Sequence, residues 1–239
     1  MDKLVARPPG SGIRHASTAL ALTGLVLVVV LHWMVFFWVN TEVTMGIVQR
    51  IFYIHVPAFW VAFVAIAIAA LCSAIYLWLR DERLDMLAVA AAEGGMLLTT
   101  VGLITGSLWG KIAWGTYWTW DMRLTLTLLL WFIYLGYFMV RGATQDPERG
   151  ARLAAVVAIV GALDLPLIHV SVLWFRSLHP QPVLLDTRQP MNLDPDMLMT
   201  LMVGLLALTV VFAGVMGFRY GLERGRRALD VQFARREAT

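Results

Sequence analysis

WGKIAWGTYWTWDMR, residues 109–123, contains four tryptophans and one tyrosine and includes an acid and two bases. Long apolar runs flank this stretch on both sides. A soluble core does not need so many large rings in so short a segment, and neither does an ordinary loop between membrane helices. We therefore interpret the stretch as a binding platform at a membrane surface, held in place by the rest of the chain.

The composition is that of a helical membrane protein. Of the 239 residues, 59% are hydrophobic and 15% are charged, and the mean hydropathy is +0.72. Soluble domains carry about 25% charged residues, whereas several apolar runs here reach the roughly 20 residues that cross a bilayer as a helix. A membrane β-barrel would instead show short segments of alternating hydrophobicity. The chain has one cysteine, which excludes an intramolecular disulfide.

Six apolar segments predict an all-α fold with six membrane-spanning helices in a single domain, residues 1–239. The segments cover about 18–39, 54–79, 86–108, 123–140, 153–174 and 197–218. The first segment is too long for the core of a signal peptide, so we expect it to remain as an anchor. Pro166 lies inside the fifth segment and removes a backbone hydrogen bond there, so we expect that helix to bend.

The distribution of positive charge predicts the orientation. Six helices place both termini on one side of the membrane, and that side holds 14 of the Lys and Arg residues, whereas the other side holds 5. Because cytoplasmic loops carry the excess of Lys and Arg, both termini are predicted to be cytoplasmic. The tryptophan-rich loop, about 109–123, and a second loop, about 175–196, then lie on the periplasmic face.

The tryptophans gather on that same predicted face. Eight of the ten lie toward it, whereas a plain aromatic belt decorates both membrane interfaces. Anchoring at the interface therefore does not explain the whole set. The eight are Trp33, Trp38, Trp60, Trp109, Trp114, Trp118, Trp120 and Trp174.

Two histidines flank the aromatic segment: His55 at the outer end of the second helix, and His179 in the second outer loop. Imidazole is a common iron ligand in haem proteins, and aromatic rings stack on flat macrocycles. The pair therefore favours a site for a flat apolar macrocycle with a central metal, although a histidine at a membrane interface is often simply solvated. Basic residues on this face offer charge-assisted hydrogen bonds to acidic groups of such a ligand. They are Arg50, Lys111, Arg123 and Arg176.

Other polar residues have structural interpretations. Asp121 precedes the fourth helix, where an acid caps free backbone N–H groups, and this role is compatible with binding. Glu93 and Asp164 lie inside predicted helices, where an ionised acid is costly and usually faces the bundle interior, paired or protonated. His32 is interpreted as a packing residue, and His169 is a weaker ligand candidate.

Residues 114–121, WGTYWTWD, match WGxxWxWD, the "WWD" motif of haem-handling membrane proteins. Three longer stretches surround the histidines and this motif: RIFYIHVPAFW at 50–60, TGSLWGKIAWGTYWTWDMRLT at 105–125, and LDLPLIHVSVLWFRSLHP at 163–180. With them the chain resembles the cytochrome c maturation protein C family (CcmC, haem exporter protein C). The likeness covers about residues 50–179, and the short six-helix plan favours this family over the larger synthetases of the same superfamily.

The resemblance implies a cargo and a set of site residues. Family members bind haem b transiently on the outer face, between the WWD loop and two histidines that match His55 and His179 as axial iron ligands. The further binding residues expected from the matching stretches are Trp109, Trp114, Trp118, Trp120, Asp121, Arg50 and Arg123.

The resemblance also implies partners in the bacterial inner membrane. The family delivers haem to the chaperone CcmE and works beside the ABC-type subunits CcmA and CcmB and the small protein CcmD. No enzymatic activity and no nucleic acid are expected, although the protein would assist covalent attachment of haem to the chaperone. Three alternatives stay open: a transmembrane haem transporter, an electron-transfer cytochrome b subunit, and a structural subunit of an ABC-type complex.

Overall fold

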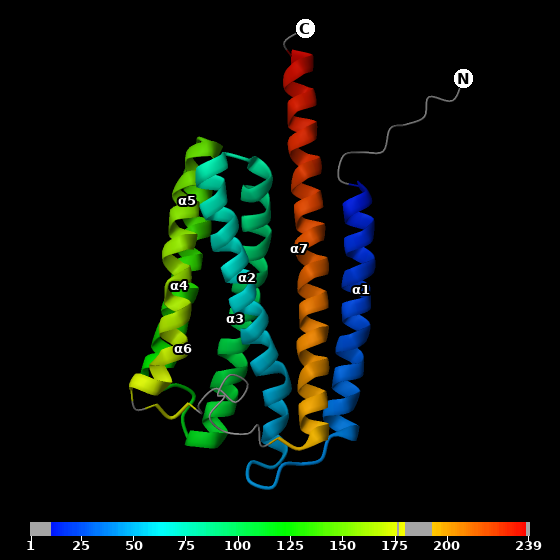
Figure 1. The fold of residues 1–239 in the computed structure, drawn as a ribbon, viewed down its shortest axis with the longest axis vertical. Coiled ribbons are helices and arrows are strands. Elements are labelled where there is room, and N and C mark those ends of the chain that lie inside the picture. Colours follow the sequence, from blue (N-terminus) through cyan, green and yellow to red (C-terminus); the bar gives the residue numbers. More distant parts are fainter. Residues whose placement is uncertain (1–10, 176, 180–192, 238–239) are drawn as a thin grey trace, which may run out of the picture.

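A computed structural model describes residues 11–175, 177–179 and 193–237, and the regular elements in these ranges are helices (Figure 1). Six of its helical stretches are long and apolar enough to cross a membrane, which confirms the prediction of a six-span, all-α fold. In chain order the elements are α1 (Ser11–Trp33), η1 (Met34–Trp38), η2 (Ile47–Ile51), α2 (Phe52–Leu79), α3 (Glu82–Trp114), α4 (Met122–Ala143), α5 (Pro147–Ala162), α6 (Asp164–Trp174) and α7 (Pro195–Glu237).

Several predicted boundaries are wrong. Helix α1 begins at Ser11 instead of near residue 18, and α5 begins at Pro147 instead of near residue 153. Helix α3 continues to Trp114, so the first part of the expected tryptophan loop is helical, and the helix ends only where Gly115 takes a left-handed conformation, φ +80°. Helix α7 runs to Glu237 instead of ending near residue 218. Its arginine-rich end remains helical and forms ion pairs through Arg227 to Glu223 on the same helix and to Glu82 on α3.

The fifth span consists of two helices, α5 and α6, that meet at Leu163. Pro166 cannot donate a hydrogen bond to the carbonyl of Ala162, so this interruption agrees with the bend expected from the sequence. Asp164 begins α6 and is 5% exposed. A structural hydrogen bond was expected for it, but its Oδ2 atom has no partner among the described residues.

Helices α1 and α7 lie side by side, and the start of α1 and the end of α7 lie at the same end of the bundle (Figure 1). Small residues allow the two backbones to approach closely: a Cβ atom on Gly24 would lie 2.6 Å from the backbone nitrogen of Val211. Helices α2–α6, together with Phe212 of α7, pack around a hydrophobic core, in which the Tyr134 hydroxyl on α4 donates to carbonyls of α2 and α5 at 3.4 Å.

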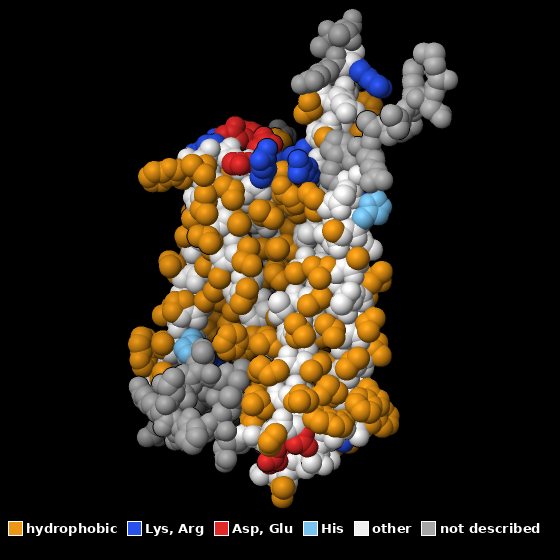
Figure 2. Space-filling model, turned by 45° about the vertical axis from the view of Figure 1, so that its right-hand side comes forward, with side chains coloured by type: hydrophobic (Ala, Val, Ile, Leu, Met, Phe, Trp, Pro, Cys, Tyr) orange, Lys and Arg blue, Asp and Glu red, His pale blue; other side chains and the backbone are white. Residues whose placement is uncertain are grey.

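The surface has the distribution expected of a membrane protein. Figure 2 shows hydrophobic side chains over the flank of the bundle and charged ones mainly near its ends. Glu93, for which the sequence left pairing and protonation open, is paired: Arg219 on α7 donates to both of its oxygens at 2.6 Å. At the end that holds the start of α1, Arg141 on α4 binds Asp85 on α3 through two bonds of 2.7 and 2.8 Å, and Arg227 approaches Asp85 at 3.1 Å.

Asp85→Ala should destabilise the protein by about 3 kcal/mol, because it leaves Arg141 without its buried partner. The side chain of Asp85 is 5% exposed. The exposed ion pair between Glu148 and Arg152 provides the control, since Glu148→Ala should cost less than about 1 kcal/mol. Thermal unfolding in detergent compares the two variants. Equal melting temperatures would contradict a stabilising role for the Asp85 pair.

Candidate functional site

The two candidate histidines lie together at the end of the bundle that is opposite the start of α1. His55 stands one turn into α2 and is 6% exposed, and His179 follows the end of α6. The centres of their rings are 6.4 Å apart, and the ring planes are inclined by 32°. Trp109 on α3 meets the His55 ring edge to face at 5.7 Å. Three segments that are distant in the sequence therefore converge on one point.

A hydrogen bond fixes the orientation of His55. Its Nδ1 atom lies 3.1 Å from the hydroxyl of Thr105 on α3. That hydroxyl donates its own proton to the backbone one turn earlier on α3, so it accepts the proton of Nδ1. The lone pair of His55 is then on Nε2, which is the arrangement found where a histidine binds a metal through Nε2.

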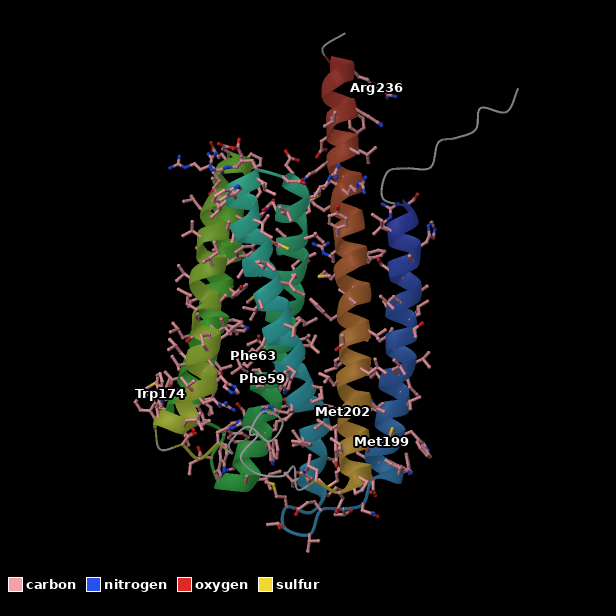
Figure 3. All side chains as sticks on the ribbon, viewed as in Figure 1. Phe59, Phe63, Trp174, Met199, Met202 and Arg236 are labelled. Carbon is pink, nitrogen blue, oxygen red and sulfur yellow. The ribbon has the colours of Figure 1, made fainter. Side chains whose placement is uncertain are left out.

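Two glycines on α3 make room for the ring of His55 and for its neighbour. A Cβ atom on Gly106 would lie 2.8 Å from Cε1 of His55, and one on Gly102 would lie 2.6 Å from the ring of Phe59. Figure 3 labels Phe59 on α2. Thr105, Gly102 and Gly106 were missed by the sequence analysis, although the last two recur at the four-residue spacing of one helix face.

A second set of hydrogen bonds ties His179 to the start of α4. Asp121 caps α4 by accepting from the backbone of Leu124 at 3.0 Å, which confirms its predicted structural role. Its other oxygen accepts from the Ser177 hydroxyl at 2.9 Å, and that hydroxyl accepts from the backbone N–H of His179 at 3.0 Å. Ser177 was not identified from the sequence, and it joins the two loops that the sequence places on one face.

Arg123, in the first turn of α4, contacts His179 directly. One guanidinium nitrogen donates to Nδ1 of His179 at 3.3 Å, and another donates to the backbone carbonyl of His169 at 3.5 Å. A guanidinium has only donors, so Nδ1 of His179 is an acceptor in this arrangement. The imidazole of His169 is not part of the pair, and only its carbonyl takes part in these contacts.

The WWD motif forms the turn between α3 and α4. Trp114 is the last residue of α3, and its ring packs over Gly110, where a Cβ atom would lie 3.2 Å away. Trp118 and Trp120 meet edge to face at 5.8 Å, and Trp120 is 76% exposed. The Thr116 hydroxyl stabilises the turn by donating a hydrogen bond to the carbonyl of Trp118 at 3.0 Å.

Several predicted residues lie elsewhere. Arg50 stacks over Phe36 at 5.7 Å, and the amine of Lys111 donates to the carbonyl of Gly115 at 3.0 Å. His32 donates from Nδ1 to the carbonyl of Val28 within α1 at 2.7 Å, which agrees with a local role. Arg176 lies outside the described residues. Trp174, labelled in Figure 3, lies at the end of α6 with 70% of its surface exposed.

Buried donors around the histidines have no partner among the described residues. The two that contact a histidine are Nε1 of Trp109, beside His55, and Nε of Arg123, beside His179. Nε1 of Trp118, on the turn, and Nε of Arg50, at Phe36, are open as well. Buried N–H groups normally donate hydrogen bonds. Several buried N–H groups without an acceptor therefore mark a place where a ligand with acceptor oxygens would gain hydrogen bonds. The donor set is thus suited to an apolar ligand that carries carboxylates.

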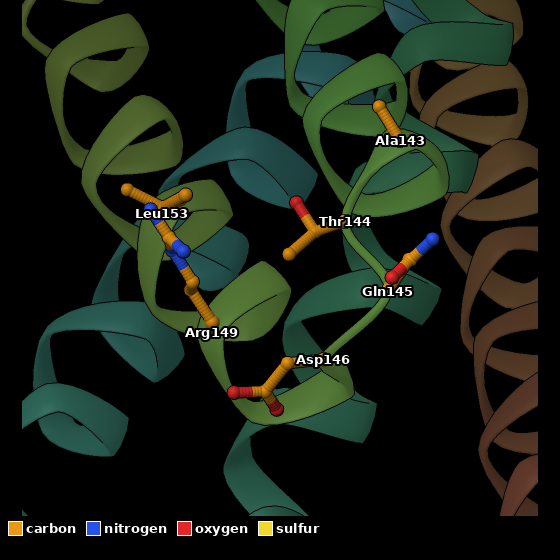
Figure 4. Close-up of a pocket in the computed structure, with 6 residues that line it drawn as sticks. All are labelled: Ala143, Thr144, Gln145, Asp146, Arg149 and Leu153. Atoms are coloured by element: carbon orange, nitrogen blue, oxygen red, sulfur yellow. The ribbon is translucent and has the colours of Figure 1, made fainter.

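A separate hollow of about 440 Å³ lies at the turn from α4 to α5, at the other end of the bundle (Figure 4). Its lining includes Asp146, which caps α5 by accepting from the backbone of Glu148 at 2.9 Å. The hollow therefore belongs to the structure of the turn and not to the histidine site.

Fold and site together define a class: a polytopic helical membrane protein with a paired-histidine, aromatic site at one end of the bundle. The model of the family CcmC, described as Heme exporter protein C, matches residues 11–234, and the chain belongs to this family. It is a multi-pass protein of the bacterial inner membrane.

Relatives from several bacteria support the assignment, and each is called Heme exporter protein C. The protein of Bradyrhizobium diazoefficiens is 41% identical over 167 residues, which is 70% of this chain and 63% of the relative. That of Escherichia coli K12 is 36% identical over 182 residues, 74% of this chain and 71% of the relative. That of Rhodobacter capsulatus is 36% identical over 161 residues, 67% of this chain and 66% of the relative.

Proposed function

We propose that this protein binds haem b as transient cargo between His55 and His179, and that it delivers this haem to the chaperone CcmE for cytochrome c maturation. The observation that carries the proposal is the pair of imidazole rings 6.4 Å apart beside Trp109. Imidazole nitrogens bind metals at about 2.0–2.1 Å, so two imidazoles on opposite sides of one metal have centres about 6 Å apart. The spacing of the pair therefore suits one metal ion held between two histidines.

The bond from Arg123 to His179 implies that Arg123 must be released before His179 can bind iron through Nε2. While Arg123 donates to Nδ1 of His179, the proton of a neutral His179 ring is on Nε2. Nε2 gains its lone pair for iron only when the ring proton moves to Nδ1 and Arg123 releases that atom. A carboxylate is a stronger acceptor for a guanidinium than a neutral imidazole is. We infer that a haem propionate takes over Arg123 and thereby makes His179 available for iron.

The aromatic residues supply the apolar surface for the macrocycle. Trp109 is packed against His55 inside the bundle, whereas Trp118 and Trp120 lie on the turn, where the exposed ring of Trp120 is accessible to a partner. In this arrangement the protein positions haem with one edge open, and the bond to CcmE forms at that open edge. No side chain of this chain is assigned a catalytic step.

The proposal includes a topology and partners. With both termini in the cytoplasm, the histidine site faces the periplasm, where CcmE would collect haem, and CcmA, CcmB and CcmD complete the assembly. Among the described residues Glu93 is paired with Arg219, so it does not supply an open polar group for a route through the bundle. Asp164, whose Oδ2 atom has no partner among the described residues, is then the one open acid of the two that the sequence places inside the spans. A single open acid favours delivery at the surface over the transporter alternative.

Loading and transfer of haem test the proposal. The purified protein should carry haem that acid acetone extracts, with the absorption spectrum of bis-imidazole iron, and should pass it to added CcmE. Trp118→Ala with Trp120→Ala should lower transfer about tenfold, because ring contacts with the macrocycle are lost. Trp78→Ala is the control, since Trp78 is 86% exposed near the other end of the bundle. Protein that never acquires haem, with or without CcmE, would overturn the proposal.

A further inference from the structure

Helix α7 extends well beyond its neighbours at the end opposite the histidine site (Figure 1). Arg227 pairs with Glu82, the first residue of α3, so this residue marks the level at which the neighbouring helices end. The ten residues from 228 to 237 continue the helix for about 15 Å past that level. Arg236, labelled in Figure 3, lies near its tip.

One face of α7 carries a row of exposed apolar residues. Their spacing of three, four, seven and four residues keeps them on one side of a helix. The first four fit the a and d positions of a coiled-coil heptad, and the fifth lies at the adjoining e position. Their exposed fractions are 41%, 39%, 41%, 48% and 58%, in the order Val215, Phe218, Leu222, Leu229 and Phe233. We call these five residues the α7 seam.

The seam crosses the boundary between membrane and water. Val215, Phe218 and Leu222 precede Arg227 and lie where lipid chains would cover apolar groups, but Leu229 and Phe233 lie beyond it. Lipid chains do not cover side chains that project past the bundle. Exposed apolar residues in a row mark a protein interaction surface, and this row continues from the membrane into water.

Charged groups beside the seam indicate the chemistry of its partner. Arg226 lies on the seam, between Leu222 and Leu229, and it is exposed. The ion pair between Arg219 and Glu93 lies eight residues deeper than Arg227, about 12 Å into the span, and its side chains are still 45% and 32% exposed. Charged groups exposed to lipid are costly, so a protein neighbour that covers them is favoured.

A second copy of this chain does not suit the seam. Two copies in one membrane have the same orientation, so a symmetric pair across the seam would place Arg226 against Arg226. Like charges at facing positions of a helical pair are unfavourable. A helix with carboxylates at that level complements the seam instead.

We propose that the α7 seam seats one helix of a different membrane protein. This helix spans the bilayer along Val215, Phe218 and Leu222 and continues into water along Leu229 and Phe233. It presents apolar residues to the seam, a hydrogen-bond acceptor to Arg219, and Asp or Glu side chains to Arg226. The site is thus a docking surface for a membrane helix that has an acidic, amphipathic extension.

Site-specific photocrosslinking of the full-length protein in native membranes tests this surface. A benzophenone amino acid is placed at Leu222, Leu229 or Phe233, and at Val231 as the matched control. Val231 is 52% exposed on the same helix, but it lies on the opposite side. Mass spectrometry of the adducts identifies the residues that are captured. The three seam positions should capture successive turns of one membrane-spanning helix and its acidic extension, and Val231 should not.

A charge change distinguishes docking from chance proximity. Leu229→Asp places a charge against the apolar side of the partner helix, and Arg226→Glu places an acid against its acidic side chains. Each variant should therefore reduce the yield of the adduct from position 222 about tenfold. Val231→Asp should leave the adduct unchanged. Haem content and melting temperature measured on the same samples show whether the variants are folded. Adducts only with lipid, only with a second copy of this chain, or equally from Val231 would overturn the proposal.

Discussion

His55→Ala should abolish stable haem binding by the purified protein, and His179→Ala should do the same. Each variant removes one of two imidazoles whose ring centres are 6.4 Å apart, so iron would keep only one axial ligand from the protein. We expect the affinity for haem to fall at least about a hundredfold, corresponding to about 2.8 kcal/mol. Titration with haem, followed by absorption spectroscopy, measures the affinity and the ligation state together.

His32→Ala is the matched control for both variants. His32 also lies on a membrane-spanning helix, but its ring bonds to the carbonyl of Val28 and stacks near Phe36 at 6.5 Å, apart from the pair. It should bind haem like the wild type. A bis-imidazole spectrum in either His55→Ala or His179→Ala would exclude that histidine as an axial ligand, provided the variant melts near the wild-type temperature.

Gly106→Ala should weaken haem binding about fivefold while both histidines remain in place. The added Cβ atom would lie 2.8 Å from Cε1 of His55, so the ring must move away from α3. Its hydrogen bond to Thr105, 3.1 Å long, is then strained or lost. A hydrogen bond of this kind contributes about 1 kcal/mol, and 1.4 kcal/mol corresponds to tenfold in affinity. The same haem titration measures the effect.

Gly136→Ala on α4 provides the control for this substitution. A Cβ atom on Gly136 would meet nothing within 4 Å, and alanine favours a helix by about 1 kcal/mol relative to glycine. This variant should bind haem normally and should melt at or above the wild-type temperature. If Gly106→Ala also binds haem normally, the fit of His55 against α3 does not determine the site.

The sequence was sufficient to predict the helices because lipid imposes a strong constraint on the chain. Every backbone polar group inside a bilayer needs an internal partner, so an apolar run of about 20 residues is helical almost regardless of its neighbours. The ends of the helices were harder to predict. The sixth segment was expected to end near residue 218, before the arginine-rich end of the chain. This end is helical in the structure, and Arg227 within it forms ion pairs with Glu82 and Asp85 on α3.

The residues of the candidate site could be predicted from the sequence only in part. His55, His179 and Trp109 are chemically distinctive, and the resemblance to a known family grouped them before any contact was known. Their supporting residues carry no such signal. Thr105, Ser177 and Gly106 are ordinary residue types, and their roles depend on which atoms lie opposite them in the folded chain.

The number of spans, the helical class and the aromatic and histidine residues of the candidate site could be read from the sequence alone, because these depend on local composition and spacing. Three other features follow only from the packing of the folded chain: the 6.4 Å approach of the His55 and His179 rings, the bond from Arg123 to His179, and the exposed seam on α7. Each of these joins or exposes groups through the packing of distant segments. Packing geometry is a property of the whole fold, so no local stretch of sequence encodes it.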